Sequence, residues 1–311
     1  MKWFYFVGGI INLLQLLKNS LYVFLGACSF GILSTIVKIA YNEGFVLHEV
    51  MAGQYGFGWT IMLILMLIFS RHRVSFKQFI RLAGVGACTC LTGFFYYLSL
   101  QSLPASIAVV LLFQFSWIGV LIEAIVTRKR PSRATLLSVI ILLVGTILAG
   151  GVIGSNDLHL NLVGVLFGLG SALMMALFIF FSGRVETGMP LLTRSFLVTT
   201  GSLLLLLIMF TPQKIFTVSL NDGLWLYGLV LGIFGAVLPV LLFALGAPKI
   251  NSGLASILSA GEFPVAVTAS VMILHEQVSW LQWLGIVIIL YGIAYPQLKE
   301  YKDSKIINVM N

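Results

Sequence analysis

The segment that decides the fold reads LASILSAGEFPVAVTASVMILHE and covers residues 254–276. Apolar residues dominate both flanks of a pair formed by Glu262 and Pro264. A run of this length can cross a bilayer as a helix, because a spanning helix needs about 20 mostly apolar residues. A carboxylate inside such a run is costly unless it has a partner or faces a wet cavity. The segment therefore predicts a membrane-spanning helix that carries a functional carboxylate near its centre.

The rest of the chain has the same apolar character. Of its 311 residues, 59% are hydrophobic and only 9% are charged, which excludes a soluble globular protein. The sequence predicts an all-α polytopic membrane protein with ten transmembrane helices around a central cavity. The expected spans are about 20–41, 47–69, 77–99, 104–127, 134–153, 160–182, 190–210, 223–246, 251–274 and 279–297. The three cysteines lie within spans without metal-ligand spacing, so we expect neither a metal site nor a cofactor.

The net charge of +8 is unevenly distributed over the connections. Alternate connections and both termini carry almost all the basic residues outside the spans, whereas the opposite side keeps only Lys214. This bias is typical of cytoplasmic loops, so we expect a cytoplasmic-membrane protein with both termini in the cytoplasm, and no nucleic-acid partner. Residues 1–19 form either an interfacial segment or an over-extended start, and residues 298–311 form a basic cytoplasmic tail.

An internal repeat divides the chain into two similar halves. A shift of 147 residues lays the fourth and fifth spans on the ninth and tenth without a gap over most of their length. Matches that composition alone does not explain include Ala108 with Ala255, Ser132 with Ser279 and Gly145 with Gly292. We therefore expect five-helix repeats at 20–153 and 160–297. Because five is an odd number, the halves must be inverted, which builds a site near the membrane midplane.

Three stretches carry a resemblance to a known family. They read FGILSTIVK (residues 30–38), LASILSAGEFPVAVTASVMILHE (254–276) and WLQWLGIVIILYGI (280–293). With the repeat, they resemble the EamA family of the drug/metabolite transporter superfamily. The resemblance implies two inverted halves around a central cavity, and export of amino acids or other small metabolites. The chain departs from the family pattern at Arg128-Lys129-Arg130, where the family often has a glutamate.

Glu262 is the leading candidate for substrate binding or proton coupling. Small and hydroxyl side chains, including Ser259, share or flank its helix face, which places the carboxylate inside the bundle. The alternative is a structural hydrogen bond to a neighbouring helix. Pro264 has no N–H and should kink the helix by freeing the carbonyl of Ala260. Pro239 should likewise kink the eighth span by freeing the carbonyl of Gly235.

Other polar side chains within the spans are further candidates for substrate contact. Lys38 either holds an anionic group at the outer side of the cavity or snorkels to the interface. Its depth differs from that of Glu262 by about 13 Å, which argues against a direct pair. Gln54 and Gln114 either contact substrate or join helices, and Tyr97 is a candidate for an aromatic cavity wall. Near the cytoplasmic end of the seventh span, Arg194 is expected to snorkel.

These features together favour a secondary transporter that works by alternating access. The sequence contains no phosphate-binding glycine loop, so we expect no direct drive by ATP. A multidrug or amine exporter of the same fold is the nearest alternative. A membrane-embedded enzyme is less well supported, because the aspartates Asp157, Asp222 and Asp303 are scattered outside the spans. The expected partners are a small-molecule substrate, the lipid bilayer and a coupling proton, and the expected state is a monomer or homodimer.

Overall fold

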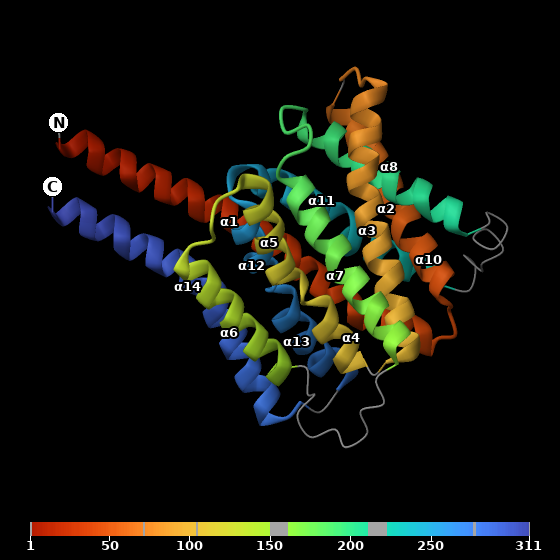
Figure 1. Cartoon of the computed structure of the whole chain (residues 1–311). Coiled ribbons are helices and arrows are strands. Elements are labelled where there is room, and N and C mark those ends of the chain that lie inside the picture. Colours follow the sequence, from red (N-terminus) through yellow and green to blue (C-terminus); the bar gives the residue numbers. More distant parts are fainter. Residues whose placement is uncertain are drawn as a thin grey trace.

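The computed structural model describes residues 2–70, 72–103, 105–149, 161–210, 223–275 and 278–310, and throughout these ranges the regular structure is helical (Figure 1). The first half contains α1 (Lys2–Asn42), α2 (Leu47–Phe69), α3 (Phe76–Ser102), α4 (Ala105–Leu112), α5 (Phe115–Thr127) and α6 (Arg133–Ala149). The second half contains α7 (Leu162–Ser182), α8 (Leu191–Met209), α10 (Leu224–Gly232), α11 (Leu238–Gly246), α12 (Ser252–Ser259), α13 (Glu262–Leu274) and α14 (Trp280–Met310). A π-helical segment, η2 (Ile233–Val237), joins α10 to α11, and a short 3-10 turn, η3 (Ala247–Lys249), follows α11.

The prediction of an all-helical membrane protein is confirmed in its coarse form. Eight helical runs in the described residues are long and apolar enough to cross a membrane, and two shorter apolar helices lie at Arg133–Ala149 and Trp280–Pro296. Ten crossings therefore remain a prediction. The expected interfacial segment at the N-terminus continues into the first span as one helix, α1. Whether that part of α1 lies at the membrane interface also remains a prediction.

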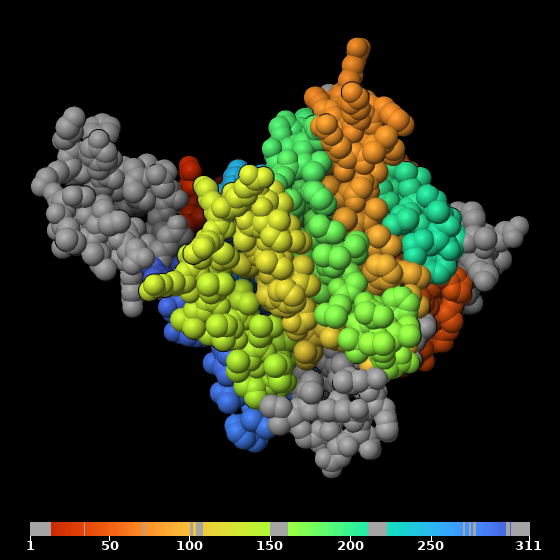
Figure 2. Space-filling model, in the orientation of Figure 1, coloured from red at the N-terminus to blue at the C-terminus, as the bar shows by residue number. Residues whose placement is uncertain are grey.

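The periphery of the bundle is apolar where lipid would contact it. Leu136, Ile140 and Val144 follow one face of α6 and are all exposed. This helix packs against α14 at one side of the molecule, away from the centre (Figures 1 and 2). Val287 and Leu290 of α14 are exposed in the same way. Since apolar side chains gain nothing by facing water, this surface is suited to a hydrocarbon environment.

The two halves repeat one another in their broken helices. The pairs α4–α5 and α12–α13 each consist of an 8-residue helix followed by a 13-residue helix. The breaks fall at Phe113–Gln114 and Ala260–Gly261, positions that correspond at the 147-residue shift. In both breaks the backbone bonds tighten to three-residue turns, with Gln114 N–H donating to Leu111 (3.2 Å) and Gly261 N–H to Leu258 (3.1 Å). The same interruption is therefore built into each half.

Matching hydrogen bonds also relate the first helices of the two halves. The hydroxyl of Ser29 donates to the carbonyl of Phe234 at 2.6 Å, and that of Ser171 donates to the carbonyl of Thr92 at 3.0 Å. Both residues of the second bond are related to those of the first by a shift of 142 residues. The first helix of each half also packs against the helices of the other half. Helix α1 packs on α11, α12 and α13, and α7 packs on α3, α4 and α5. This reciprocal exchange is the pattern expected of two repeats related by a two-fold axis.

The connections give the two ends of the bundle different charge. Those joining α2 to α3, α5 to α6 and α7 to α8 lie at the upper side of Figure 1. Together with the α11–α12 connection, they carry a cluster of basic residues that includes Arg73, Arg128, Lys129, Arg184 and Lys249. We call this side the basic end, and the other the opposite end.

Candidate functional site

The candidate site lies where the two helix breaks meet. Phe113 at the first break and Phe263 just after the second contact each other edge to face, with ring centroids 4.9 Å apart. Glu262 is the first residue of α13. The corresponding first residue of α5 is Phe115, which is completely buried. The two halves therefore bring equivalent backbone geometry to the centre, but only the second supplies a carboxylate there.

The break beside Glu262 uses the carbonyl that Pro264 leaves without its normal helical donor. Phe263 donates its N–H to the carbonyl of Ala260 at 3.2 Å. The first half forms the equivalent bond, from Ser116 to Phe113, also at 3.2 Å and without a proline. Pro264 is thus compatible with the break but does not create it. Sequence reasoning missed the first-half break because no helix-breaking residue marks it.

Glu262 lacks a hydrogen bond at one of its oxygens. Its Oε2 atom is buried and, within the described residues, has no hydrogen-bond partner. Cys28 of α1 and Tyr96 of α3 lie close enough to interact electrostatically with the carboxylate. Buried polar atoms are normally paired, so an unpaired carboxylate oxygen marks a position where a ligand or a proton would be stabilising. The choice between a functional carboxylate and a structural hydrogen bond to a neighbouring helix stays a prediction, because this observation concerns only one of the two carboxylate oxygens.

Helix α1 passes unusually close to the break. A Cβ atom placed on Gly31 would lie 2.5 Å from the carbonyl oxygen of Glu262, so only glycine fits at this crossing. One turn earlier, the thiol of Cys28 donates to the carbonyl of Gly261 at 3.7 Å. These contacts fix α1 against the first turn of α13. They also give the carboxylate a fixed position relative to α1.

Lys38 lies on the same face of α1 as Gly31, two turns further along the helix. At 1.5 Å per residue, this separation is about 10 Å along the helix axis. Lys38 is exposed, although its neighbours Val37 and Ala40 are buried. Lys38 and the glycine that meets the backbone of Glu262 therefore lie on the same face of α1.

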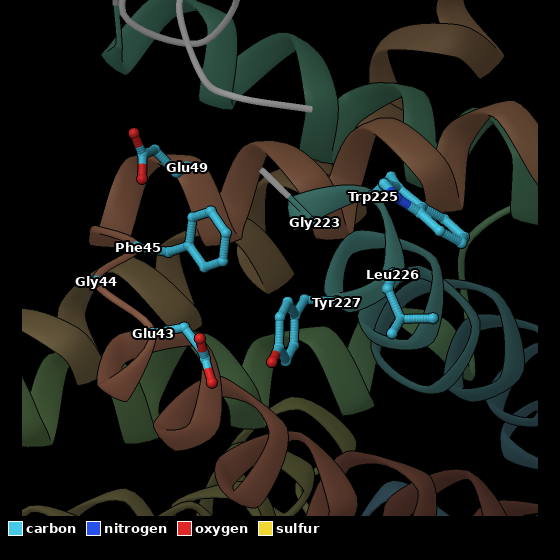
Figure 3. Close-up of a pocket in the computed structure, with 8 residues that line it drawn as sticks. All are labelled: Glu43, Gly44, Phe45, Glu49, Gly223, Trp225, Leu226 and Tyr227. Carbon is cyan, nitrogen blue, oxygen red and sulfur yellow. The ribbon is translucent and has the colours of Figure 1, made fainter. Parts of the chain in front are cut away.

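A row of tyrosines extends from the neighbourhood of Glu262. The ring centroids of Tyr96 and Tyr97 are 6.0 Å apart, and those of Tyr97 and Tyr41 are 6.3 Å apart. Tyr97, expected in an aromatic wall, is thus connected to Glu262 through Tyr96. Near the end of α1, a pocket of about 490 Å³ opens at the start of α10 (Figure 3). Its lining consists of Glu43, Gly44, Phe45, Glu49, Gly223, Trp225, Leu226 and Tyr227.

Three other predicted site residues are engaged in bonds within the protein. Gln54 donates its amide to the carbonyl of Gly235 at 3.4 Å, which is the carbonyl that Pro239 leaves free. Gln114 donates to the carbonyl of Val110 at 2.8 Å and accepts from the indole of Trp117 at 2.8 Å. The hydroxyl of Ser259 donates to the carbonyl of Ala255 at 2.8 Å. These contacts support the alternative role of Gln54 in joining helices, and give Gln114 and Ser259 local roles beside the breaks.

Arg194 differs from its prediction. It was expected to snorkel, but it is only 4% exposed and lies within the bundle near the basic end. Its guanidinium donates to the carbonyls of Val185 at 3.0 Å and Ala244 at 3.2 Å, and also to that of Ser182. The last turn of α7 leaves the carbonyl of Ser182 without a helical donor, and the planar guanidinium satisfies it together with the carbonyls of Val185 and Ala244. Sequence reasoning missed this role because the acceptors come from three separate segments.

Comparison with known proteins agrees with the fold and the repeat. The chain is similar in fold to a solved protein whose title reads only "Crystal structure of protein", with a TM-score of 0.74 and 19% sequence identity over 92% of this chain and 98% of the other. No curated protein matches the chain. The EamA-like transporter family matches twice, over residues 17–151 and 162–295, one match for each repeat. The resemblance drawn from the sequence is therefore confirmed, and the chain belongs to the EamA-like transporter family, whose members are membrane transporters of the drug/metabolite type.

Proposed function

We propose that this transporter exports small zwitterionic metabolites, such as amino acids and related compounds, across the cytoplasmic membrane. The observation that carries the proposal is the buried, unpaired Oε2 atom of Glu262 at the meeting point of the two breaks. A substrate ammonium group supplies the donors that this oxygen lacks. Such a charge-assisted hydrogen bond is stronger than a neutral one, particularly away from water.

Lys38 supplies the second half of the proposed recognition. It lies about 10 Å from Gly31 on the face of α1 that crosses the Glu262 segment, and long flexible side chains close much of that distance. The carboxylate of an amino acid would bind Lys38 while its ammonium group binds Glu262. The charge order of the site then matches that of a zwitterion. The tyrosine row beside Glu262 would contact the substrate side chain.

The two breaks support transport by alternating access. A broken helix bends at its interruption with little loss of backbone hydrogen bonding, because the turn at the break already replaces regular helical bonds. With breaks in corresponding positions of both halves, the site can be exposed to one end and then the other. The basic end is proposed to face the cytoplasm, in accordance with the distribution of Lys and Arg.

The experiment that tests the proposal compares zwitterions with matched amines. Purified protein is reconstituted into liposomes, and flux is measured for an amino acid such as leucine and for the amine without its carboxylate, isopentylamine. Glu262→Gln is expected to reduce flux of both compounds at least tenfold. Lys38→Gln is expected to reduce amino-acid flux to a similar extent, while amine flux changes less than twofold.

The same measurements distinguish the alternative functions. An amine or multidrug exporter would carry isopentylamine in the wild type, and Lys38→Gln would leave all of its fluxes unchanged. A wild-type protein that carries neither compound nor any other amino acid of a standard panel would overturn the proposal. Gly56→Ala, at a position with open space around the added methyl group, is the control for the effect of mutation itself.

A further inference from the structure

The pseudo-two-fold symmetry is broken at one place close to the candidate site. On the basic-end side of the breaks, α5 packs along α12. The corresponding helices on the other side, α13 and α4, have no comparable packing within the described residues. Among the described residues, α5 and α12 are therefore closely packed, whereas α4 and α13 are not.

The contact between α5 and α12 is too close to admit a larger side chain. A Cβ atom on Gly119 would lie 1.9 Å from Oγ of Ser256, and Ser256 is completely buried. The corresponding residues at the opposite end are Ala266 and Val109. Since these two side chains are larger than Gly119 and comparable with or larger than Ser256, the same approach is not available there. The close contact of Gly119 with Ser256 therefore has no equivalent of the same closeness at the opposite end.

An ion pair spans the closed helices from outside. Nη2 of Arg184 lies 2.7 Å from Oε2 of Glu123, which belongs to the last turns of α5. Nη1 of the same guanidinium donates to the hydroxyl of Ser252, the first residue of α12. The guanidinium also lies 4.0 Å from the ring centre of Phe180, at the end of α7. One side chain therefore connects α5, α12 and α7, and so joins the first half to the second.

The positions that correspond to this arrangement in the repeat are uncharged. By the two repeat shifts, Glu123 corresponds to Ser270, Ser252 to Ala105 and Arg184 to Asn42. None of these three residues carries a charge. The ion pair is therefore not a feature of the repeat itself.

We propose that Arg184 is a positioning residue that holds the basic end of the transport pathway closed and is released in each cycle. It acts through Glu123 and Ser252, and it has no contact with the Glu262 site among the interactions of the described residues. Because the pair is partly exposed, with side-chain exposures of 34% and 18%, water can replace its bonds when the helices separate. The closure is thus reversible. This inference rests on the proposed alternating access.

The test measures access to the closed contact directly. Ser256→Cys is introduced into a protein whose Cys28, Cys88 and Cys90 are replaced by alanine, and labelling by a membrane-impermeant maleimide is followed from the basic end. Labelling is expected to be slow, and to become at least fivefold faster in Arg184→Gln and in Glu123→Gln. The charge-swapped double variant, Glu123→Arg with Arg184→Glu, is expected to restore slow labelling, which a merely misfolded protein would not do.

A second ion pair at the same end provides the matched control. Arg81 and Glu186 form a surface pair at 3.0 Å that joins α3 to the α7–α8 connection. Arg81→Gln should leave the labelling rate of Ser256→Cys unchanged. Equal labelling rates in wild type and Arg184→Gln would overturn the inference, as would acceleration by Arg81→Gln. Labelling requires no substrate, so the two proposals can fail separately. If the wild type transports amino acids but Arg184→Gln does not change the labelling rate, only the role of Arg184 is refuted. If the labelling rate changes but no amino acid is transported, only the proposed substrates are refuted.

Discussion

At the scale of single residues, buried polar groups decide how this bundle is held together. Gln54 satisfies a carbonyl in the interrupted eighth span, and Arg194 satisfies three carbonyls near the end of α7. Glu262 differs, since its Oε2 atom is buried and has no hydrogen-bond partner in the part of the chain that the structure describes. An apolar interior makes each unpaired polar group costly. Gln54 and Arg194 therefore stabilise the fold, whereas the unpaired oxygen of Glu262 would be stabilised by a bound ligand or a proton.

Arg194→Gln is expected to destabilise the protein by about 2 kcal/mol or more, because one buried carbonyl and two partly buried carbonyls would lose the guanidinium donor. Thermal unfolding in detergent, followed by tryptophan fluorescence or by a thiol-reactive dye, measures the change as a lower Tm. Arg81→Gln is the control, since this exposed side chain forms a single surface pair and its loss should change stability by less than about 1 kcal/mol. Equal Tm values for the two variants would contradict the role assigned to Arg194.

At the scale of elements, the break in α12–α13 could be anticipated, but its counterpart could not. Glu262 and Pro264 interrupt an apolar segment visibly in the sequence. Phe113 and Gln114 are ordinary residues for a membrane helix, and packing of the surrounding helices decides their turn geometry. The 147-residue shift was readable from Ala, Ser and Gly matches. The 142-residue shift that relates Ser29 to Ser171 is hidden, because apolar residues align with apolar residues at any shift.

Gly31→Ala tests the crossing of α1 over the second break. The added methyl group would lie 2.5 Å from a backbone oxygen that cannot rotate away, so α1 and α13 must separate. We expect a loss of stability of about 1–3 kcal/mol, the usual cost of overpacking, together with at least a tenfold loss of flux. Gly56→Ala, a helical glycine with no neighbouring atom within 4 Å of the added methyl group, should change neither quantity appreciably. Normal flux in Gly31→Ala would show that the crossing is not needed.

At the scale of the whole molecule, duplication and asymmetry have separate roles. The repeat supplies two equivalent broken helices and the reciprocal exchange of α1 and α7. The departures from the repeat supply the charged groups, because Glu262 corresponds to Phe115 in the other half and Arg184 corresponds to Asn42. Composition and repeat could predict the two halves and the lone central carboxylate, but not the break in the first half. The Arg184–Glu123 pair could not be predicted, because it joins α5 to the α7–α8 connection, and the proximity of these two segments arises only from the folded arrangement.

A single central carboxylate that is exposed to each end in turn is also suited to carry a proton. In such an exchange, Glu262 would bind a proton when open to the side opposite the cytoplasm, and would release it inside before the outgoing substrate binds. Acidifying the outer side should therefore accelerate export, and removing the pH gradient should slow it. Proteoliposomes loaded with substrate and diluted into buffers of different pH measure this dependence. Glu262→Gln cannot exchange protons, so its transport should not respond to the imposed pH gradient. An unchanged response in this variant would show that Glu262 does not couple transport to protons. Its role in substrate binding is tested separately by the zwitterion and amine fluxes.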